Sequence, residues 1–240
     1  MTAHNSWSAI YDQVNKASFG SMIDALTRKT LEVVPTLFEN GGSVLDAGAG
    51  TGRISLELAN LGYDVVAIDA SEGMTEKHQA KMAEHGFSYP VIHSPIQEYE
   101  PTKEFDLVIC VHTVTSYLHT NEMLEAAIET FKKSLKPGGR VLVDLANPML
   151  FQDSSYQDGS FDRQVSFEPM GENRFVYHEE TTIECDGEEV SYEDTFSLRA
   201  WGREEFEAKF YRSGFNLQND LSREFSGSGH FYLVFERGRD

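Results

Sequence analysis

Residues 44–53 read VLDAGAGTGR, and this stretch decides the fold. It predicts a short buried strand that ends in the carboxylate Asp46, a glycine-rich turn, and a helix that begins at Arg53. Glycine adopts positive φ angles without strain and lets a ligand approach the backbone closely. Because the free N–H groups of a helix start point into the same space, we expect the turn to bind a nucleotide or a nucleoside.

The spacing of the glycines narrows the kind of nucleotide. The dinucleotide fingerprint is G-x-G-x-x-G, but here Gly48, Gly50 and Gly52 alternate, and Arg53 stands where the third glycine is expected. A phosphate-binding P-loop requires a lysine followed by serine or threonine, and this turn contains no lysine. Both phosphate-binding interpretations are therefore disfavoured. A tight strand-to-helix turn without a ligand is the plain alternative.

Length and composition exclude several classes of protein. The chain has 240 residues, enough for one large α/β domain or for one domain with an insertion. Its net charge of −19 disfavours nucleic acid and anionic membranes as partners. Cys110 and Cys185 lie in different contexts and indicate no disulfide framework. Residues 1–10 show no signal-peptide pattern, and no apolar run approaches the length of a membrane span. We therefore expect a soluble, cytoplasmic protein.

Strand and helix patterns alternate after the glycine-rich turn. Before the turn, apolar residues at helical spacing predict two helices within residues 6–40, broken near Phe19 and Gly20 and ended by Gly41 and Gly42. The alternation predicts a doubly wound parallel sheet with helices on both faces. Ligands bind such sheets at the carboxyl ends of the strands. The predicted strands are 43–47, 64–69, 90–93, 105–111 and 140–145, with helices at 53–60, 71–86 and 121–135.

The pattern changes after Asn147. Residues 151–160 are polar and rich in turn formers, whereas 161–167, 174–185 and 190–200 are predicted antiparallel strands, with Asp186-Gly187 as a hairpin turn. This insertion is strongly acidic between residues 179 and 194, which favours an amine ligand or indicates a solvated hairpin face. A helix at 203–211 and strands beginning at 214 and 230 then return to the core pattern.

These motifs resemble the class I S-adenosylmethionine-dependent methyltransferases of the small-molecule type. The resemblance rests on residues 44–52, on 65–69 with Ser71 and Met74, on 105–111, and on the phrase LKPGG at 135–139. It implies an α/β fold with a doubly wound, seven-stranded, mostly parallel sheet whose last strand is antiparallel. The strand pattern adds to this fold an antiparallel β insertion after the fifth strand. S-adenosyl-L-methionine is the implied cofactor and methyl donor, and a small molecule is the implied acceptor.

The same resemblance implies one methyltransferase domain over residues 1–240. Its parts would be an N-terminal helical cap at 1–40, a Rossmann-like core at 41–147 and 202–240, and the insertion at 148–201 as a lid over the methyl acceptor. Because an exposed hairpin with free edges is a common contact between subunits, a homodimer is also compatible with this organisation.

Ten residues would bind the donor. Asp69 ends the second strand 21 positions after Gly48, which suits an acidic residue that accepts hydrogen bonds from ribose hydroxyls. By resemblance, Gly48 and Gly50 would lie against the methionine part of the donor, and Asp46 would orient the turn or contact the donor through water. Met74 and Ile96 would sandwich the adenine, and Gln97 would face its edge. The main chain near Cys110 and Val111 would meet the donor's amino group. Tyr11 would fold over the donor, or it is an ordinary helix-packing tyrosine.

Methyl transfer from a sulfonium requires alignment and a dry site more than covalent help. A general base is needed only if the acceptor must lose a proton. His112, just beyond the fourth strand, is the best placed candidate for a catalytic base, and a packed or solvated histidine is the alternative. His78 and His85 lack the carboxylate and the third ligand of a metal site, so no metal is expected.

The acceptor is expected between the N-terminal helices and the insertion, where aromatic residues offer an apolar surface. Sheet core is the alternative for these residues, which are Phe151, Tyr156, Phe161, Phe175, Tyr177 and Trp201. The sequence does not choose among N, O, C and S acceptors. Two other functions stay open: a regulatory protein that binds S-adenosylmethionine without transferring its methyl group, and a nicotinamide oxidoreductase that binds NAD without the third glycine.

Overall fold

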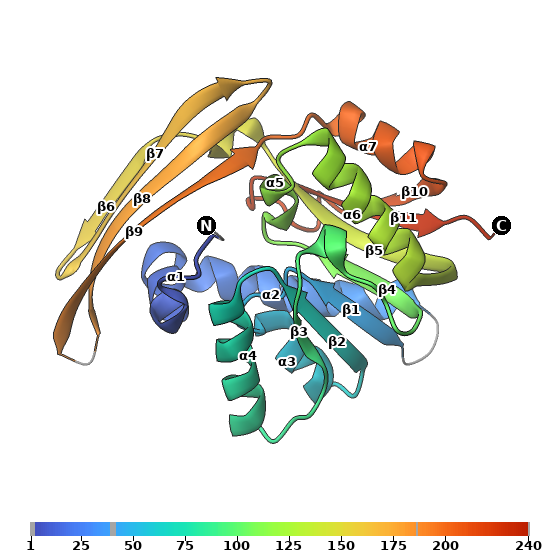
Figure 1. Ribbon diagram of the computed structural model, residues 1–240, viewed down its shortest axis with the longest axis horizontal. Coiled ribbons are helices and arrows are strands. Elements are labelled where there is room, and N and C mark those ends of the chain that lie inside the picture. Colours follow the sequence, from blue (N-terminus) through green and yellow to red (C-terminus); the bar gives the residue numbers. More distant parts are fainter. Residues whose placement is uncertain (1–2, 39–41, 186, 240) are drawn as a thin grey trace.

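The main sheet has seven strands in the order β10-β11-β5-β4-β1-β2-β3. The computed structural model describes residues 3–38, 42–185 and 187–239 (Figure 1). Strands β1 to β5 are parallel, and β11 is antiparallel to both of its neighbours, β5 and β10. The predicted doubly wound sheet with an antiparallel last strand is therefore confirmed. The strands are β1 Ser43–Ala47, β2 Asp64–Asp69, β3 Val91–His93, β4 Phe105–Cys110, β5 Leu135–Ala146, β10 Phe215–Asp220 and β11 His230–Arg237.

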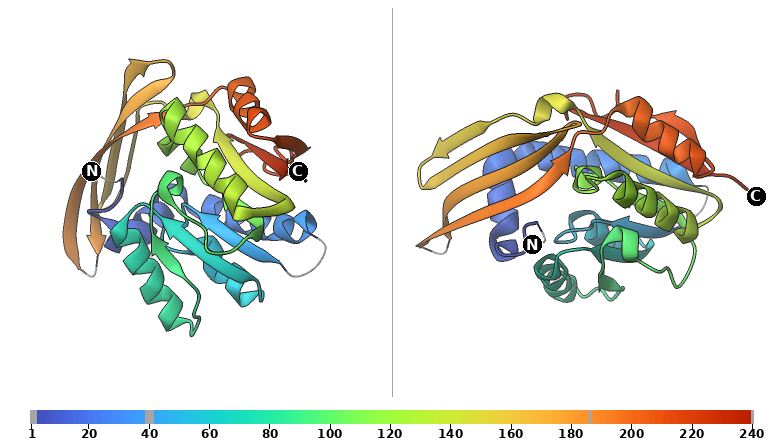
Figure 2. Two further views of the ribbon diagram at one scale, coloured as in Figure 1. Left: turned by 45° about the vertical axis from the view of Figure 1, so that its right-hand side comes forward. Right: turned by 45° about the horizontal axis from the view of Figure 1, so that its top comes forward.

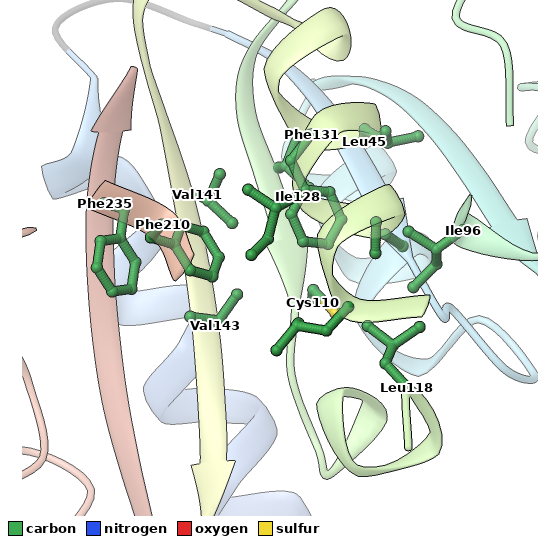
Figure 3. Packing of buried hydrophobic residues seen from close by; sticks show 14 of the residues in the cluster. Leu45, Ile96, Cys110, Leu118, Ile128, Phe131, Val141, Val143, Phe210 and Phe235 are labelled. Carbon is green, nitrogen blue, oxygen red and sulfur yellow. The ribbon is translucent and has the colours of Figure 1, made fainter. Parts of the chain in front are cut away.

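Helices cover both faces of this sheet, and each face has its own apolar core. On one face, Ile128 and Phe131 of α6 lie over the sheet, and Phe210 of α7 stacks on Phe235 of β11 with ring centroids 4.1 Å apart (Figure 3). On the other face, α2, its following turn and α3 bury Val34 and Leu58. None of the helices within the described residues is long and apolar enough to cross a membrane. The helices are α1 Tyr11–Phe19, α2 Ser21–Val33, α3 Arg53–Asn60, α4 Glu72–Glu84, α5 Val114–Tyr117, α6 Asn121–Ser134 and α7 Arg203–Arg212, with 3-10 turns η1 Ser8–Ile10, η2 Val34–Leu37, η3 Ile96–Glu98 and η4 Pro148–Leu150.

The insertion after β5 is a separate four-stranded antiparallel sheet, β6-β7-β8-β9. Its strands are β6 Ser154–Asp158, β7 Phe161–Gly171, β8 Arg174–Cys185 and β9 Glu188–Arg199. Figure 2 shows it as a long curved sheet that stands beside the core, with α1 between the two. Trp7 and Val14 pack against Phe161 and Ile183, so the N-terminal part of the chain holds the inner face of this sheet.

Two sequence predictions are wrong in detail. Residues 151–160 contain the strand β6, which has no apolar alternation because all five of its residues are exposed. The turn predicted at 136–139 is an irregularity inside β5: the pairing with β4 shifts register between Phe105 and Leu107, and Gly138 has a φ of +78°. The predicted turn residues Gly41 and Asp186 lie outside the described residues.

Candidate active site

A cavity of about 810 Å³ lies where β1, β2 and β4 end, between the core and the four-stranded sheet. Ligand pockets commonly have volumes of roughly 300–1,000 Å³, so this one has room for a nucleoside and a second molecule. Cys110 does not line it, because its side chain is buried in the core of the sheet (Figure 3). The other predicted site residues do line it: Tyr11, Asp46, Gly48, Gly50, Asp69, Met74, Ile96, Gln97, Val111 and His112.

The glycine-rich turn is shaped by close packing as well as by backbone angles. Gly48 has a φ of +82°, and a Cβ there would lie 2.5 Å from the Val114 side chain. At Gly52, with a φ of +88°, a Cβ would overlap the ring of His78. His78 is fully buried under the turn and shares a hydrogen bond of 2.8 Å with the Tyr89 hydroxyl. Its position therefore supports the turn.

Asp69 links the glycine-rich turn to the start of α4. Its Oδ2 accepts a hydrogen bond of 2.8 Å from Gly50 N, and its Oδ1 accepts one of 2.8 Å from Ser71 N. Burial raises the pKa of Asp69, and these two hydrogen bonds act in the opposite direction. Each carboxylate oxygen keeps a further lone pair. The group is therefore a fixed double acceptor, suited to two neighbouring hydroxyls.

Asp46 and Arg53 lie together beneath the turn. Asp46 Oδ2 accepts a hydrogen bond of 2.5 Å from Ser55 Oγ, and burial raises the pKa of Asp46 to about 6 although Ser55 and the Arg53 charge oppose the shift. The Arg53 guanidinium donates to Thr27 Oγ1 and to the Ile23 carbonyl. Sequence reasoning used Arg53 as the start of a helix and as the residue that breaks the dinucleotide fingerprint, and missed it as a cation in the cavity wall.

His112 stands on a strained turn after β4. His112 and Thr113 have φ angles of +66° and +72°, which are unfavourable for residues other than glycine. The fully buried Asp144 of β5 offsets this strain, because its carboxylate accepts hydrogen bonds of 2.7 Å from His112 N and 3.0 Å from Thr113 N. Sequence reasoning missed Asp144, which lies in the otherwise apolar run 141–146 of β5. Through these two hydrogen bonds, Asp144 fixes the position of His112.

The imidazole of His112 is neutral at neutral pH. Burial, helped by the nearby Arg53 charge, holds the pKa of His112 well below its usual value. Its Nε2 is buried and has no hydrogen-bond partner among the described residues. Because His112 lines the cavity, a neutral imidazole here can accept a hydrogen bond from a bound molecule or hold one in place by packing.

The N-terminal segment, residues 3–7, crosses from α4 to β9 beside the cavity. Asn5 Oδ1 accepts hydrogen bonds of 2.9 Å from both Ser71 Oγ and Gly73 N at the start of α4. At the other end, His4 N and Trp7 Nε1 donate to Asp194 Oδ2 over 2.7 and 2.9 Å. This segment was not predicted as part of the site, since its contacts reach residues far away in the sequence.

Two of the acidic residues of the insertion are already paired. Glu179 is buried and accepts hydrogen bonds from Arg163, Thr181, Tyr192 and Tyr177. Burial alone would raise its pKa, but Arg163, Tyr177 and Thr181 lower it. Asp194 is held by the N-terminal segment. The other acids described between residues 179 and 194, which are Glu180, Glu184, Glu188, Glu189 and Glu193, are exposed. Among these described acids, no buried carboxylate is left unpaired to bind an amine acceptor. The prediction of a solvated hairpin face is confirmed for the exposed ones.

The aromatic residues proposed as the acceptor surface lie elsewhere. Trp201 is in the core of the main sheet and donates to the Leu118 carbonyl over 3.1 Å. Phe151 stacks on Phe175 within the insertion, and Tyr156 is about half exposed. The sheet-core alternative is therefore confirmed for Trp201, Phe151 and Phe175. Phe161 packs against Trp7 and Val14 of the N-terminal part and does not line the cavity. The aromatic rings that line the cavity are Tyr11, Tyr117 and Phe196, with the imidazoles of His4, His112 and His119.

Comparisons with known proteins agree with this geometry. The family described as "Methyltransferase domain" matches residues 44–139. The Bacillus subtilis (strain 168) protein named "Putative methyltransferase YqeM" is 30% identical over 189 residues, which cover 73% of this chain and 74% of that protein.

Two solved structures share the fold over nearly the whole chain. An S-adenosylmethionine-dependent methyltransferase from Clostridium acetobutylicum ATCC 824 superposes with a TM-score of 0.83 at 16% identity, covering 98% of this chain and 99% of that one. The amino pentose methyltransferase CalS10 of Micromonospora echinaspora, solved with bound S-adenosylmethionine, gives 0.74 at 18% identity over 95% and 96%. These relatives favour neither the oxidoreductase nor the binding-only alternative. The chain belongs to the class I S-adenosylmethionine-dependent methyltransferases, enzymes that use S-adenosylmethionine as methyl donor.

Proposed function

We propose that this enzyme methylates the amino group of a small polar molecule. One observation indicates that the acceptor is small. The N-terminal segment bridges α4 and β9 beside the cavity through Asn5, His4 and Trp7. A cavity bounded in this way admits a small molecule more readily than a polymer. In this proposal the insertion, residues 148–201, and the N-terminal cap, residues 1–40, act together as the acceptor lid.

The donor would occupy the half of the cavity next to the glycine-rich turn. Asp69 offers two fixed acceptors to the ribose hydroxyls. Met74 and Ile96 would hold the adenine between them, with Gln97 at its edge. The half-buried Arg53 cation, which lines the cavity, would face the donor's carboxylate, since guanidinium groups pair well with carboxylates.

The remaining donor contacts would direct the methyl group toward the insertion. Gly48 and Gly50 would let the methionine part approach the backbone, the main chain near Cys110 and Val111 would meet the amino group, and Tyr11 would close over the donor. The reactive methyl would then face the part of the cavity lined by His112, Tyr117 and Phe196.

Three features support an amino group as the nucleophile. The net charge of −19 raises the local concentration of cations such as ammonium ions. The neutral His112 imidazole can accept an N–H hydrogen bond and so orient the nitrogen lone pair toward the methyl group. CalS10, which shares the fold, is described as an amino pentose methyltransferase.

The chemical step itself needs little from the protein. The nitrogen lone pair forms the new N–C bond as the C–S bond breaks, and its electron pair stays on sulfur. Because the leaving thioether is neutral, the enzyme contributes mainly alignment and exclusion of water.

A labelled methyl group tests this proposal. The purified protein would be incubated with methyl-labelled S-adenosylmethionine and either glucosamine or glucose, which differ in one amino group. We expect the label on the nitrogen of glucosamine or of another amine in a wider panel of amino sugars, and none on the matched hydroxyl compounds. Transfer to hydroxyl compounds alone would contradict the proposal.

A further inference from the structure

Three side chains from distant parts of the chain stand in line at the acceptor half of the cavity. Asp194 of β9 lies next to His4 of the N-terminal segment, with Oδ2 3.4 Å from Nδ1. The other ring nitrogen of His4, Nε2, lies 2.7 Å from the hydroxyl of Tyr117 in α5. His4 and Tyr117 both line the cavity, whereas the side chain of Asp194 is only 5% exposed.

The surroundings of Asp194 determine which nitrogen of His4 carries the proton. Its Oδ2 also accepts hydrogen bonds from His4 N and Trp7 Nε1. These donors hold the pKa of Asp194 below its usual value although burial opposes them, so the group is a carboxylate at neutral pH. The 3.4 Å contact does not have hydrogen-bond geometry, and the buried Nδ1 has no hydrogen-bond partner among the described residues. The negative charge of the neighbouring carboxylate nevertheless favours the proton on that nitrogen. The lone pair of His4 then lies on Nε2, and the Tyr117 hydroxyl donates to it.

The backbone and the neighbouring rings hold His4 in this position. His4 has a φ of +61°, a conformation that costs free energy for a residue with a side chain. Its ring is packed by Trp7, Tyr11 and Phe196, with centroids 5.0, 5.5 and 5.0 Å away. These rings limit the access of water to the His4–Tyr117 contact.

The other titratable groups near the expected methyl position, His112 and Tyr117, are poor bases for removing a proton from the acceptor. The pKa of His112 lies well below its usual value because of burial and the Arg53 charge, so it accepts a hydrogen bond but does not keep a proton at neutral pH. Burial raises the pKa of Tyr117 well above its usual value, so a lasting phenolate is unfavourable. His119 also lines the cavity, but its Nδ1 lies 3.1 Å from the Tyr117 carbonyl and not from the hydroxyl. Among the described residues of the cavity wall, His4 combines a ring nitrogen at the Tyr117 hydroxyl with a carboxylate near its other nitrogen.

We propose that Tyr117, His4 and Asp194 form a proton relay that deprotonates the acceptor before it is methylated. The inference rests on the proposed function, because it assigns the acceptor's ammonium form to that site. One ammonium proton passes to Tyr117 Oη while the hydroxyl proton of Tyr117 passes to His4 Nε2. Asp194 stabilises the resulting imidazolium and acts as a positioning residue.

The charges and atoms of the cycle balance. The freed nitrogen lone pair forms the N–C bond, the C–S bond breaks toward sulfur, and the products are neutral S-adenosylhomocysteine and a methylated ammonium ion. The proton on His4 returns to solvent. In the net reaction, one ammonium ion and one sulfonium ion give one methylated ammonium ion, one neutral thioether and one released proton. No further reactant is needed.

A proton acceptor has a signature that a merely structural residue lacks: its loss is rescued at alkaline pH. Tyr117→Phe keeps the ring that packs on Phe196 and removes only the hydroxyl. With glucosamine as probe, we expect turnover to fall about 100-fold at pH values below the pKa of the amine. We expect only a small loss above that pKa, where the amine enters uncharged. Tyr156→Phe, at an exposed position, is the matched control and should behave like the wild type.

The pH profile must be assigned to His4 rather than to its neighbours. The titratable groups that face His4 are Asp194 on β9, Tyr117 on α5, Tyr11 on α1 and Asp69 at the end of β2, whose pKa responds to the His4 charge. His4→Asn should give the same alkaline rescue as Tyr117→Phe, whereas a loss that is equal at all pH values in both variants would overturn the relay.

A second measurement needs no acceptor. In protein labelled with ¹⁵N-histidine and saturated with S-adenosylhomocysteine, the ring nitrogen shifts of His4 should report the Nδ1–H tautomer, and Asp194→Asn should remove that preference. A proton on Nε2 in the wild type would overturn the relay. Because this readout does not depend on turnover, the relay can fail while amine methylation stands, and amine methylation can fail while the tautomer is as expected.

Discussion

Replacing Asp69 by asparagine should weaken the binding of S-adenosylmethionine about 30-fold. The carboxylate is fixed by hydrogen bonds of 2.8 Å from Gly50 N and Ser71 N, which leave one lone pair on each oxygen for the ribose hydroxyls. Asparagine has nearly the same shape but only one acceptor oxygen and no charge. Its NH₂ group would also face one of the two main-chain donors.

The magnitude follows from the change in hydrogen-bond strength. Hydrogen bonds to a charged group contribute roughly 1.5–3 kcal/mol and neutral ones roughly 0.5–1.5 kcal/mol. The loss is therefore about 1 kcal/mol for each of two hydroxyls, or about 2 kcal/mol in total. At about 1.4 kcal/mol for each factor of ten in affinity, this corresponds to a dissociation constant raised by a factor of about 30.

Calorimetric titration with S-adenosylmethionine measures this effect, and thermal unfolding shows whether the variant is folded at the temperature of the titration. Asp64→Asn is the matched control, because Asp64 begins the same strand that Asp69 ends and only pairs with Lys103 at the surface. A folded Asp69→Asn protein whose affinity stays within twofold of the control would refute the placement of the ribose.

Three further perturbations test other parts of the site. His112→Ala should slow turnover about tenfold, the value of one lost hydrogen bond to the acceptor, while the donor affinity is unchanged; equal turnover would assign His112 to packing. Burial raises the folded-state pKa of Asp46 from 3.8 to about 6, so its ionisation costs the folded state and stability falls as the pH rises between these values. In urea unfolding, Asp46→Asn should lack this loss, and an unchanged pH slope would contradict the assignment. Asp144→Ala should lower the free energy of unfolding by about 3 kcal/mol, because His112 N and Thr113 N lose their acceptor; a loss below about 1 kcal/mol would show that the turn does not depend on it.

Local patterns were sufficient for the fold. The glycine-rich turn, the apolar strand runs and the capping residue Ser71 each act within a few residues, so the strands and helices of the core could be predicted closely. Strand β6 could not, because its five exposed residues carry no apolar alternation, and only pairing with β7 makes it a strand.

The site could be predicted only in part. Residues at the carboxyl ends of strands, such as Asp69 and His112, follow from the topology of a parallel sheet. Asp144 and His4 do not, since their partners lie 32 and 190 positions away in the sequence. For a related reason, the sequence left two places open for the aromatic residues of the insertion, the acceptor surface and the sheet core: alternation along a strand shows which residues share a face, but not what that face covers.

The most direct test of the donor site is a crystal structure of the protein with S-adenosylhomocysteine. The account predicts ribose hydroxyls within hydrogen-bond distance of Asp69, adenine between Met74 and Ile96, and the sulfur facing the part of the cavity lined by His112 and Tyr117. A nucleoside bound the other way round, with adenine toward the insertion, or bound outside this cavity, would contradict it.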